Sequence, residues 1–264
     1  MLSRITSSIE NLLFTKTDDL VDNEEICEKP NEKYPTEFEL RINSSDVPLA
    51  LYKSISYGKY KNKWCGVDMM KDPLSMGVYN ALVSDQKFGT IFELGTYKGA
   101  SAHWFHTIAK QYNENVLTYS FDINDPSFAV DCKFLDVPNL HYVQMDAINT
   151  YKDIFSSTFL KDKPKPWLII EDCHVNIINV LSYLDIYLTK GDYIVIEDTN
   201  PLGPYKPITS DDEPFFSFGM KKMNETKEFI KKVKFTSNYI VDTTYCDLYG
   251  YNCSWQWNSV LKKV

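Results

Sequence analysis

Hydrophobic positions follow two alternating patterns along the chain after residue 64. Some stretches repeat their apolar residues at helical spacing, and the runs between them are short and continuously apolar, as in buried strands. We expect helices over 72–83, 100–112, 176–188 and 224–233. We expect strands over 90–94, 116–121, 141–143, 167–170, 193–196, 239–241 and 255–261. This alternation predicts an α/β fold, in which a mostly parallel sheet of seven strands carries helices on both faces.

Two segments lack this regular pattern. Residues 1–59 are polar and acidic and are interrupted by prolines, so we expect a partly structured arm that packs against the main body or a second subunit. Residues 201–218 are rich in Pro, Asp and Phe, and we expect an insertion there, either a lid or a plain mobile loop. Residues 60–264 are expected to form one domain.

The composition narrows the class of protein. With a formal net charge of −8, the chain does not offer the clustered Lys and Arg that binding a nucleic acid requires. No apolar run reaches the roughly 18 residues that a membrane-spanning helix needs, and no signal peptide is recognisable. The six cysteines are scattered without a CxxC pair, which favours reduced thiols over disulfides. We therefore expect a cytoplasmic protein without a nucleic-acid partner or a membrane span.

Acidic residues stand where the predicted strands end, at Glu93, Asp122, Asp146, Asp172, Glu197 and Asp198. Ligands of open parallel sheets bind outside the carboxyl ends of the strands. Acids gathered at these positions therefore indicate a binding site rather than ordinary surface charge.

The first of these strands leads into a glycine loop. Gly95 and Gly99 stand four apart, which differs from the GxGxxG spacing of dinucleotide-binding proteins. Glycines let the backbone approach a ligand closely, and the start of the following helix offers free N–H groups. Glu93 suits a cation or an amino group, and Asp122 can accept both hydroxyls of a ribose. The pattern is that of class I S-adenosylmethionine-dependent methyltransferases, and the alternative is a plain turn after a buried strand.

A second group of acids predicts a metal site. Glu171 and Asp172 end one strand, and Glu197 and Asp198 end the next. Neighbouring strands lie about 4.8 Å apart, so the carboxylates can converge, and they would repel one another unless protonated or bound to a metal. Oxygen ligands of this kind suit Mg²⁺, with Mn²⁺ or Ca²⁺ as alternatives. His174 is a candidate general base beside the metal, whereas acids that merely cap helices are the other interpretation.

Other conspicuous residues receive structural interpretations. His103 and His106 are expected at a surface or in helix packing, and the lysine-rich stretch 221–232 on a solvated helix face. Trp255 and Trp257 alternate with Gln256, so we expect both indoles on one side of a strand, in core packing rather than sugar stacking.

The chain resembles the cephalosporin hydroxylase / rhamnosyl O-methyltransferase family and the related macrolide-sugar O-methyltransferases. The resemblance lies in 64–67 with 72–74, in the glycine loop 92–101, in the segment GDYIVIEDTN at 191–200, and in the closing stretch 241–263. It covers about 60–264, and GDYIVIEDTN is its most specific part. The arm 1–59 falls outside it.

The resemblance implies a Rossmann-like class I methyltransferase domain over 60–264, with S-adenosylmethionine and Mg²⁺ or Mn²⁺ as cofactors. It implies a cofactor site of Glu93, Gly95, Thr96, Gly99, Ser101, Asp122, Asp146 and Ala147, with Asp146 at the adenine amino group. The implied metal ligands are Asp172, Glu197 and Asp198, and the implied catalytic residues are His174 and Asp172. The segment 171–174 departs from the family's D-x-D-H spacing, so Glu171 stays open as an alternative to Asp172.

The expected activity is methylation of a sugar hydroxyl, on a rhamnose-like residue of a glycan or glycoconjugate. Three alternatives stay open: a small-molecule O-methyltransferase, an oxidoreductase or hydroxylase on the same fold, and a binding protein without turnover. The missing GxGxxG motif counts against the redox enzyme. The expected partners are the cofactor and a carbohydrate acceptor, and the N-terminal arm makes a homodimer plausible.

Overall fold

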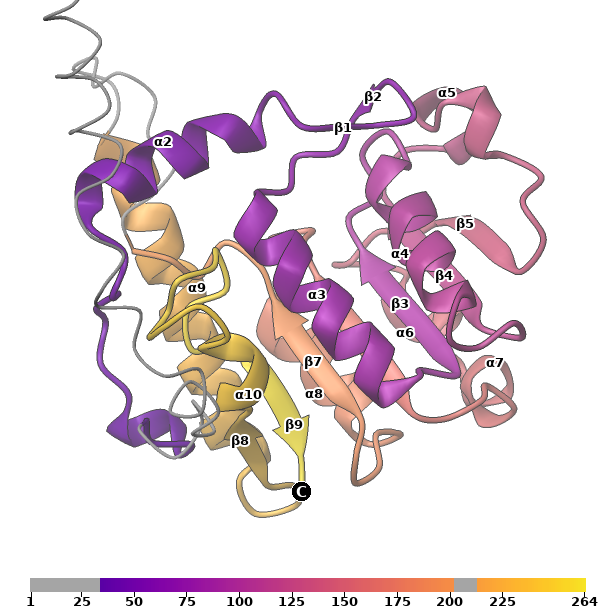
Figure 1. The fold of residues 1–264 in the computed structure, drawn as a ribbon. Helices are drawn as coiled ribbons and strands as arrows, with labels where there is room; N and C mark the ends of the chain where they lie inside the picture. The colour runs from indigo at the N-terminus through magenta and orange to yellow at the C-terminus, as the bar shows by residue number, and fades with distance from the viewer. Residues whose placement is uncertain (1–33, 202–212) are drawn as a thin grey trace, which may run out of the picture.

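The computed structural model describes residues 34–201 and 213–264. At its centre lies a seven-stranded sheet of order β5-β4-β3-β6-β7-β9-β8 (Figure 1). Its strands are β3 (Thr90–Leu94), β4 (Leu117–Asp122), β5 (Leu140–Gln144), β6 (Trp167–Glu171), β7 (Tyr193–Ile196), β8 (Tyr239–Val241) and β9 (Val260–Lys263). Strands β3 to β7 pair in parallel, and β9 runs antiparallel to both β7 and β8. The predicted seven-stranded, mostly parallel sheet is confirmed.

Helices cover both faces of this sheet. The longer ones are α2 (Leu49–Lys59), α3 (Pro73–Gln86), α4 (Ala100–Lys110), α8 (Ile177–Asp185) and α9 (Glu213–Val233). The short elements are η4 (Phe38–Leu40), α5 (Pro126–Ala129), η5 (Cys132–Phe134), α6 (Tyr151–Ile154), α7 (Ser157–Lys161), α10 (Thr243–Cys246) and a hairpin of β1 (Lys63–Trp64) and β2 (Val67–Asp68). In Figure 1, α3 and α4 lie in front of the sheet and α8 lies behind it.

The burial of the central strands explains their sequence pattern. Every residue of β3, β6 and β7 is buried, because helices on both faces exclude water from both sides of a strand. Such strands carry continuous apolar runs instead of alternating ones.

Helix α3 begins where Asp72 accepts hydrogen bonds from the backbone N–H groups of Leu74 and Ser75, with Pro73 in the first turn.

The N-terminal segment from residue 34 packs against the main body. Arg41 is buried and donates two hydrogen bonds to the Asp247 carboxylate, at 2.8 and 2.7 Å. Within the expected arm, residues 49–59 form α2, and the buried Tyr52 ring of this helix packs on the Trp255 indole. In Figure 1, α2 and the β1–β2 hairpin cross the edge of the sheet at which β3 and β7 end. Residues 1–33 lie outside the described residues.

The expected last strand is shorter than predicted. The expected strand 255–261 begins only at Val260, because Asn258 has a left-handed backbone (φ 56°) that interrupts an extended chain. Trp255, Gln256 and Trp257 are all buried in a turn, so the two indoles do pack in the core, but without strand alternation.

The expected boundaries of the insertion and of the last long helix also change. Helix α9 starts at Glu213, so residues 213–218 are helical and not part of a loop. The rest of the expected lid, 202–212, lies outside the described residues. Within the described ranges, no helix combines the length and the apolar character needed to cross a membrane.

Candidate active site

A cavity of about 590 Å³ opens at the carboxyl ends of the parallel strands. It is lined by residues that follow β3, β4, β5 and β6, by Asp198 after β7, and by Lys59 with residues 68–70 from the N-terminal segment. The cavity therefore lies where the strand-end acids of the sequence predicted a site.

Most of the expected cofactor residues line this cavity: Gly95, Thr96, Ser101, Asp122, Asp146 and Ala147. Glu93 and Gly99 do not belong to its lining. Glu93 is fully buried beneath the glycine loop, where its carboxylate accepts a hydrogen bond of 2.5 Å from the Ser120 hydroxyl. Burial raises the pKa of Glu93 to about 7, against the opposing effect of the Lys71 ammonium.

Asp122 fixes the glycine loop to the end of β4. Its Oδ2 accepts hydrogen bonds of 3.0 Å from the backbone N–H groups of Thr96 and Tyr97. Its Oδ1 accepts two more from Asn124. The carboxylate that we expected to receive ribose hydroxyls therefore also shapes the loop around the cavity.

The two glycines of the loop serve close packing. A Cβ atom on Gly95 would lie 2.6 Å from the Asp172 carbonyl oxygen, and the φ of 109° also favours glycine. A Cβ atom on Gly99 would lie 2.7 Å from Val130 Cγ1. Gly95 thereby lets the glycine loop after β3 contact the residue that follows β6, and this contact places the loop beside Asp172.

Three of the side chains that line the cavity lie close together. Asp172 Oδ1 and Asp198 Oδ2 each lie 3.5 Å from His174 Nε2, and one potential ligand atom from each residue lies within 4.8 Å of the others. The two carboxylates offer oxygen ligands that suit Mg²⁺ or Mn²⁺, and the imidazole lies beside them. The structure thus brings together Asp172, Asp198 and the candidate base His174.

Glu197 lies outside this group. It is buried, and its carboxylate accepts hydrogen bonds from the Tyr79 hydroxyl of α3, at 2.7 Å, and from the Lys71 ammonium, at 2.6 Å. Both residues follow the end of β7, and Asp198 has a left-handed backbone (φ 57°), so Glu197 points toward α3 while Asp198 lines the cavity. Burial and the nearby Asp172 charge raise the pKa of Glu197 to about 7.

The same separation distinguishes Glu171 from Asp172. Glu171 is fully buried and pairs with the Lys222 ammonium at 2.8 Å, and it also accepts the backbone N–H of His174. Asp172 lines the cavity. Of the two acids, the structure places Asp172 in the group with His174.

The sequence interpretation missed three buried lysines around these acids. Lys59 at the end of α2 contacts Asp198 Oδ1 at 2.8 Å, and Lys71 before α3 contacts Asp172 Oδ2 at 2.7 Å. Lys222 of α9 is also buried, so the expectation of a fully solvated lysine face on this helix is wrong. Burial opposes the charge on each acid, but Lys71 lowers the pKa of Asp172 and Lys59 lowers the pKa of Asp198.

His174 is held by its surroundings in one orientation. The Lys222 Nζ lies 2.7 Å from Nδ1, and the Phe218 ring packs edge-on at 4.9 Å. Burial and then the Lys222 charge lower the pKa of His174, which favours the neutral ring. An ammonium group only donates, so Nδ1 accepts and the proton of the neutral ring lies on Nε2, toward the two aspartates.

The remaining histidine predictions concern helix packing. His103 accepts a hydrogen bond of 2.7 Å from the Trp64 indole N–H, and His106 is buried beside the Thr118 hydroxyl at 3.0 Å. Neither lines the cavity. Their expected role in packing is confirmed.

Known proteins resemble this chain in sequence and in fold. The family model described as "Rhamnosyl O-methyltransferase/CmcI" matches residues 56–256. A protein of Mycobacterium tuberculosis named rhamnosyl O-methyltransferase is 24% identical over 195 residues, which cover 67% of this chain and 78% of that protein. Its namesake in Mycobacterium leprae is 23% identical over 184 residues, with coverages of 62% and 77%.

Solved structures of CmcI share the fold. One titled as an apo structure aligns with a TM-score of 0.58 at 20% identity, and covers 96% of this chain and 99% of that one. Another, titled with Mg and SAM, aligns with a TM-score of 0.55 at 23% identity, with coverages of 78% and 77%. The prediction of a class I S-adenosylmethionine-dependent O-methyltransferase is thereby confirmed, and the chain belongs to the Rhamnosyl O-methyltransferase/CmcI family.

Proposed function

We propose that this enzyme transfers a methyl group from S-adenosylmethionine to a sugar hydroxyl, with a divalent metal ion held by Asp172 and Asp198 beside the general base His174. One observation carries the proposal: these three side chains line the same cavity as the glycine loop. The cofactor and the acceptor hydroxyl would therefore meet inside one enclosure.

The cofactor residues that line the cavity have complementary chemistry. S-adenosylmethionine supplies a methyl group on a positively charged sulfur. Asp122 offers carboxylate oxygens to the ribose hydroxyls, and Asp146 offers them to the adenine amino group, while Gly95 and Thr96 border the methionine part. Glu93 would support the glycine loop indirectly, because its carboxylate accepts a hydrogen bond from Ser120 and does not line the cavity.

The metal would be held by Asp172 Oδ1 and Asp198 Oδ2, with His174 beside it as the base. Glu197 is the expected ligand that we leave out, because its carboxylate is bound by Lys71 and Tyr79. A divalent cation, when bound, lowers the pKa of a coordinated hydroxyl. The chemistry of the donor set supports a metal, as does the CmcI structure titled with Mg and SAM.

We propose that His174 takes the acceptor proton at Nε2 whenever its own proton lies on Nδ1. Lys222 can release Nδ1 and still keep a partner, because it also pairs with Glu171 Oε2 at 2.8 Å. Asp172 and Asp198 flank Nε2 and stabilise the protonated ring that results. Lys222 would thus control which ring nitrogen carries the proton.

A sugar acceptor is favoured by the relatives, which are named rhamnosyl O-methyltransferases. The test is an acceptor screen with labelled S-adenosylmethionine and Mg²⁺, using rhamnosides, other glycosides and catechols. We expect label on a rhamnoside hydroxyl. If only catechols become labelled, the acceptor is a small molecule rather than a sugar. If no hydroxyl becomes labelled, the proposal is contradicted.

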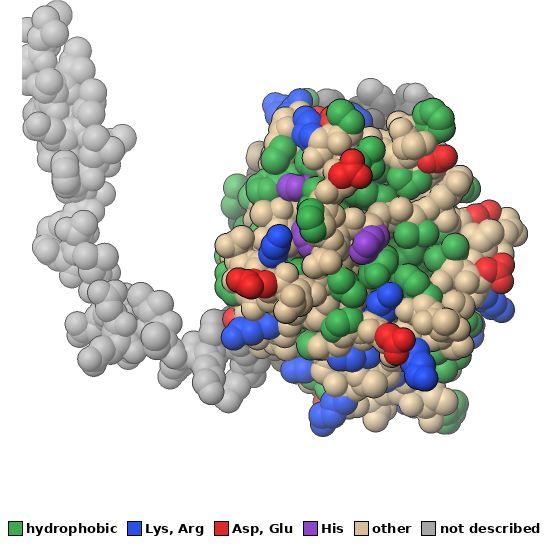
Figure 2. All heavy atoms as spheres, turned by 90° about the vertical axis from the view of Figure 1, so that its right-hand side faces the viewer, with side chains coloured by type: hydrophobic (Ala, Val, Ile, Leu, Met, Phe, Trp, Pro, Cys, Tyr) green, Lys and Arg blue, Asp and Glu red, His purple; other side chains and the backbone are tan. Residues whose placement is uncertain are grey.

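Three further expectations stay predictions: a homodimer, a cytoplasmic location and the lack of a nucleic-acid partner. On the face shown in Figure 2, the Lys and Arg side chains are interspersed with Asp and Glu rather than gathered in one patch. This distribution is consistent with the net charge of −8 and with a small-molecule acceptor.

A further inference from the structure

Each metal-binding side chain of the proposed site uses one of its two polar atoms for a lysine. Lys59 holds Asp198 by Oδ1, and Asp198 Oδ2 faces His174. Lys71 holds Asp172 by Oδ2, and Asp172 Oδ1 faces His174. The lysines therefore stand behind the carboxylates and leave their inner oxygens free for a ligand.

The ionic network has one more negative than positive group when its acids are ionised and His174 is neutral. The carboxylates are those of Glu171, Asp172, Glu197 and Asp198, and the ammonium groups are those of Lys59, Lys71 and Lys222. A bound divalent ion changes the net charge of this network from negative to positive. If the network had one lysine fewer, the same ion would bring its net charge to zero. The lysines thus compete with the divalent ion for the same carboxylates.

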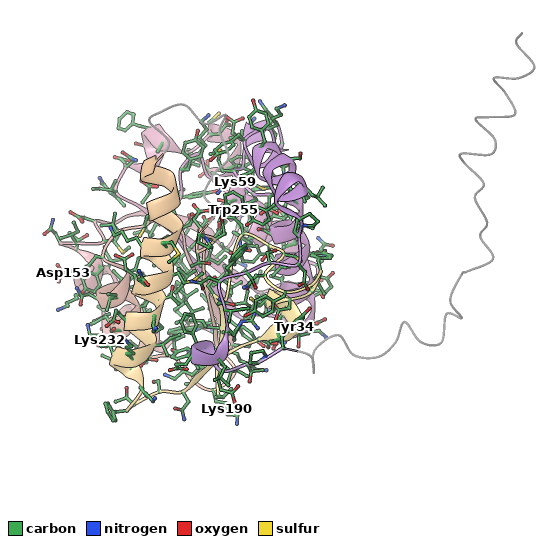
Figure 3. The ribbon with its side chains drawn as sticks, turned by 90° about the vertical axis from the view of Figure 1, so that its left-hand side faces the viewer. Tyr34, Lys59, Asp153, Lys190, Lys232 and Trp255 are labelled. Atoms are coloured by element: carbon green, nitrogen blue, oxygen red, sulfur yellow. The ribbon has the colours of Figure 1, made fainter. Side chains whose placement is uncertain are left out.

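Of the three lysines in this network, Lys59 lines the cavity itself. Its ammonium lies 2.8 Å from Asp198 Oδ1 and 4.7 Å from the centre of the Trp255 ring. Figure 3 shows Lys59 and Trp255 close together. The Trp255 ring is stacked on Tyr52 of the same helix α2, at 5.7 Å. A cation at the C-terminal end of a helix and over an indole is stabilised twice, so the ammonium stays beside Asp198.

We propose that Lys59 is a positioning residue and built-in counter-ion that lowers the affinity of the metal site while fixing Asp198 in a one-oxygen binding mode. This inference rests on the metal site of the proposed function. Loss of the lysine charge leaves the half-buried Asp198 carboxylate without its ammonium partner, and a divalent ion is then the best replacement for that charge. Tighter metal binding is therefore expected on removal of Lys59, the opposite of what loss of a purely structural residue would give.

The test measures Mn²⁺ binding to the full-length protein by the electron paramagnetic resonance signal of free Mn²⁺, without S-adenosylmethionine. We expect Lys59→Met to bind Mn²⁺ about tenfold more tightly than the wild type. Lys59→Arg keeps the charge and should bind as the wild type does. The matched control is Lys61→Met, because Lys61 is exposed and packs on the Tyr57 ring.

Each outcome decides between the two claims. If the wild type binds Mn²⁺ and Lys59→Met binds it with equal or lower affinity, the proposed role of Lys59 is wrong and the metal site stands. Absence of Mn²⁺ binding in both proteins overturns the metal site as well. If Lys59→Met does not fold, Lys59→Gln removes the same charge with a polar end, and the same comparison applies to it.

Discussion

Glu197 and Asp198 are consecutive in the chain, yet their carboxylates enter different surroundings. Glu197 is bound by the Tyr79 hydroxyl of α3 and by the Lys71 ammonium, whereas Asp198 Oδ2 faces His174 Nε2 in the cavity. Both residues lie just after the end of β7, and the left-handed backbone of Asp198 (φ 57°) turns the chain there. This separation makes the two acids unequal candidates for binding a metal.

The first prediction uses this pair of neighbours. Asp198→Asn should abolish Mn²⁺ binding and lower methyl transfer roughly 100-fold or more, because a ligand of the metal is lost. Glu197→Gln should retain Mn²⁺ binding, because its carboxylate contacts Lys71 and Tyr79 instead. Calorimetric titration of both variants with Mn²⁺ checks this. Loss of binding in Glu197→Gln, with its fold intact by circular dichroism, would restore Glu197 as a ligand.

The second prediction concerns the contact between the glycine loop and β6. Gly95→Ala should lower the free energy of unfolding by about 2–3 kcal/mol, because the new Cβ meets the Asp172 carbonyl and φ is positive. Gly66→Ala is the control, since Gly66 also has a positive φ of 83° but open space around it. Its loss should be about 1 kcal/mol. Equal losses in urea unfolding would show that the close contact is unimportant.

The third prediction is a pH dependence caused by Glu93. Its folded pKa of about 7 lies above the ordinary value, so the folded state keeps a proton that the unfolded state has lost. The stabilisation is complete below the unfolded pKa and disappears as pH rises through about 7. Between about pH 5 and pH 8, the wild type should lose up to about 3 kcal/mol more unfolding free energy than Glu93→Gln. Parallel curves for the two proteins in metal-free urea titrations would contradict this.

The fourth prediction tests how the N-terminal segment is attached. Arg41→Met should cost about 3 kcal/mol of unfolding free energy, because it leaves the buried Asp247 carboxylate without its partner. Lys63→Met removes an exposed ion pair of 3.4 Å with Asp68 and should cost less than about 0.5 kcal/mol. Thermal and urea unfolding of both variants measure the difference. A small effect of Arg41→Met would mean that residues 34–48 contribute little to the fold.

Local patterns were sufficient to predict the sheet and the position of the site. Fully buried strands such as β3 give continuous apolar runs, and the acids Asp122, Asp146 and Asp172 lie at strand ends or within two residues of them. Both signals are therefore contained in short stretches of sequence. The strand expected at 255–261 failed because one left-handed residue, Asn258, interrupts it, and hydrophobicity carries no information about that backbone angle.

The lysines of the site could not be found in this way. Lys59, Lys71 and Lys222 come from three segments far apart in the sequence and meet only in the folded protein. Lys222 stands among exposed lysines of α9 and shares their local pattern, so its burial depends on the packing of α9 against the end of β6. The sole sequence signal was indirect: several acids at neighbouring strand ends require cations, and we assigned that role to a metal alone.

The central claim is that methyl transfer to a sugar hydroxyl depends on a metal held by Asp172 and Asp198. The most direct measurement follows the label from S-adenosylmethionine to a rhamnoside, with the same enzyme after EDTA treatment and after Mg²⁺ or Mn²⁺ is added back. We predict that transfer falls to background with EDTA and returns with either metal, and that Asp172→Asn does not recover. Transfer that continues unchanged after EDTA, or in Asp172→Asn, would contradict the account.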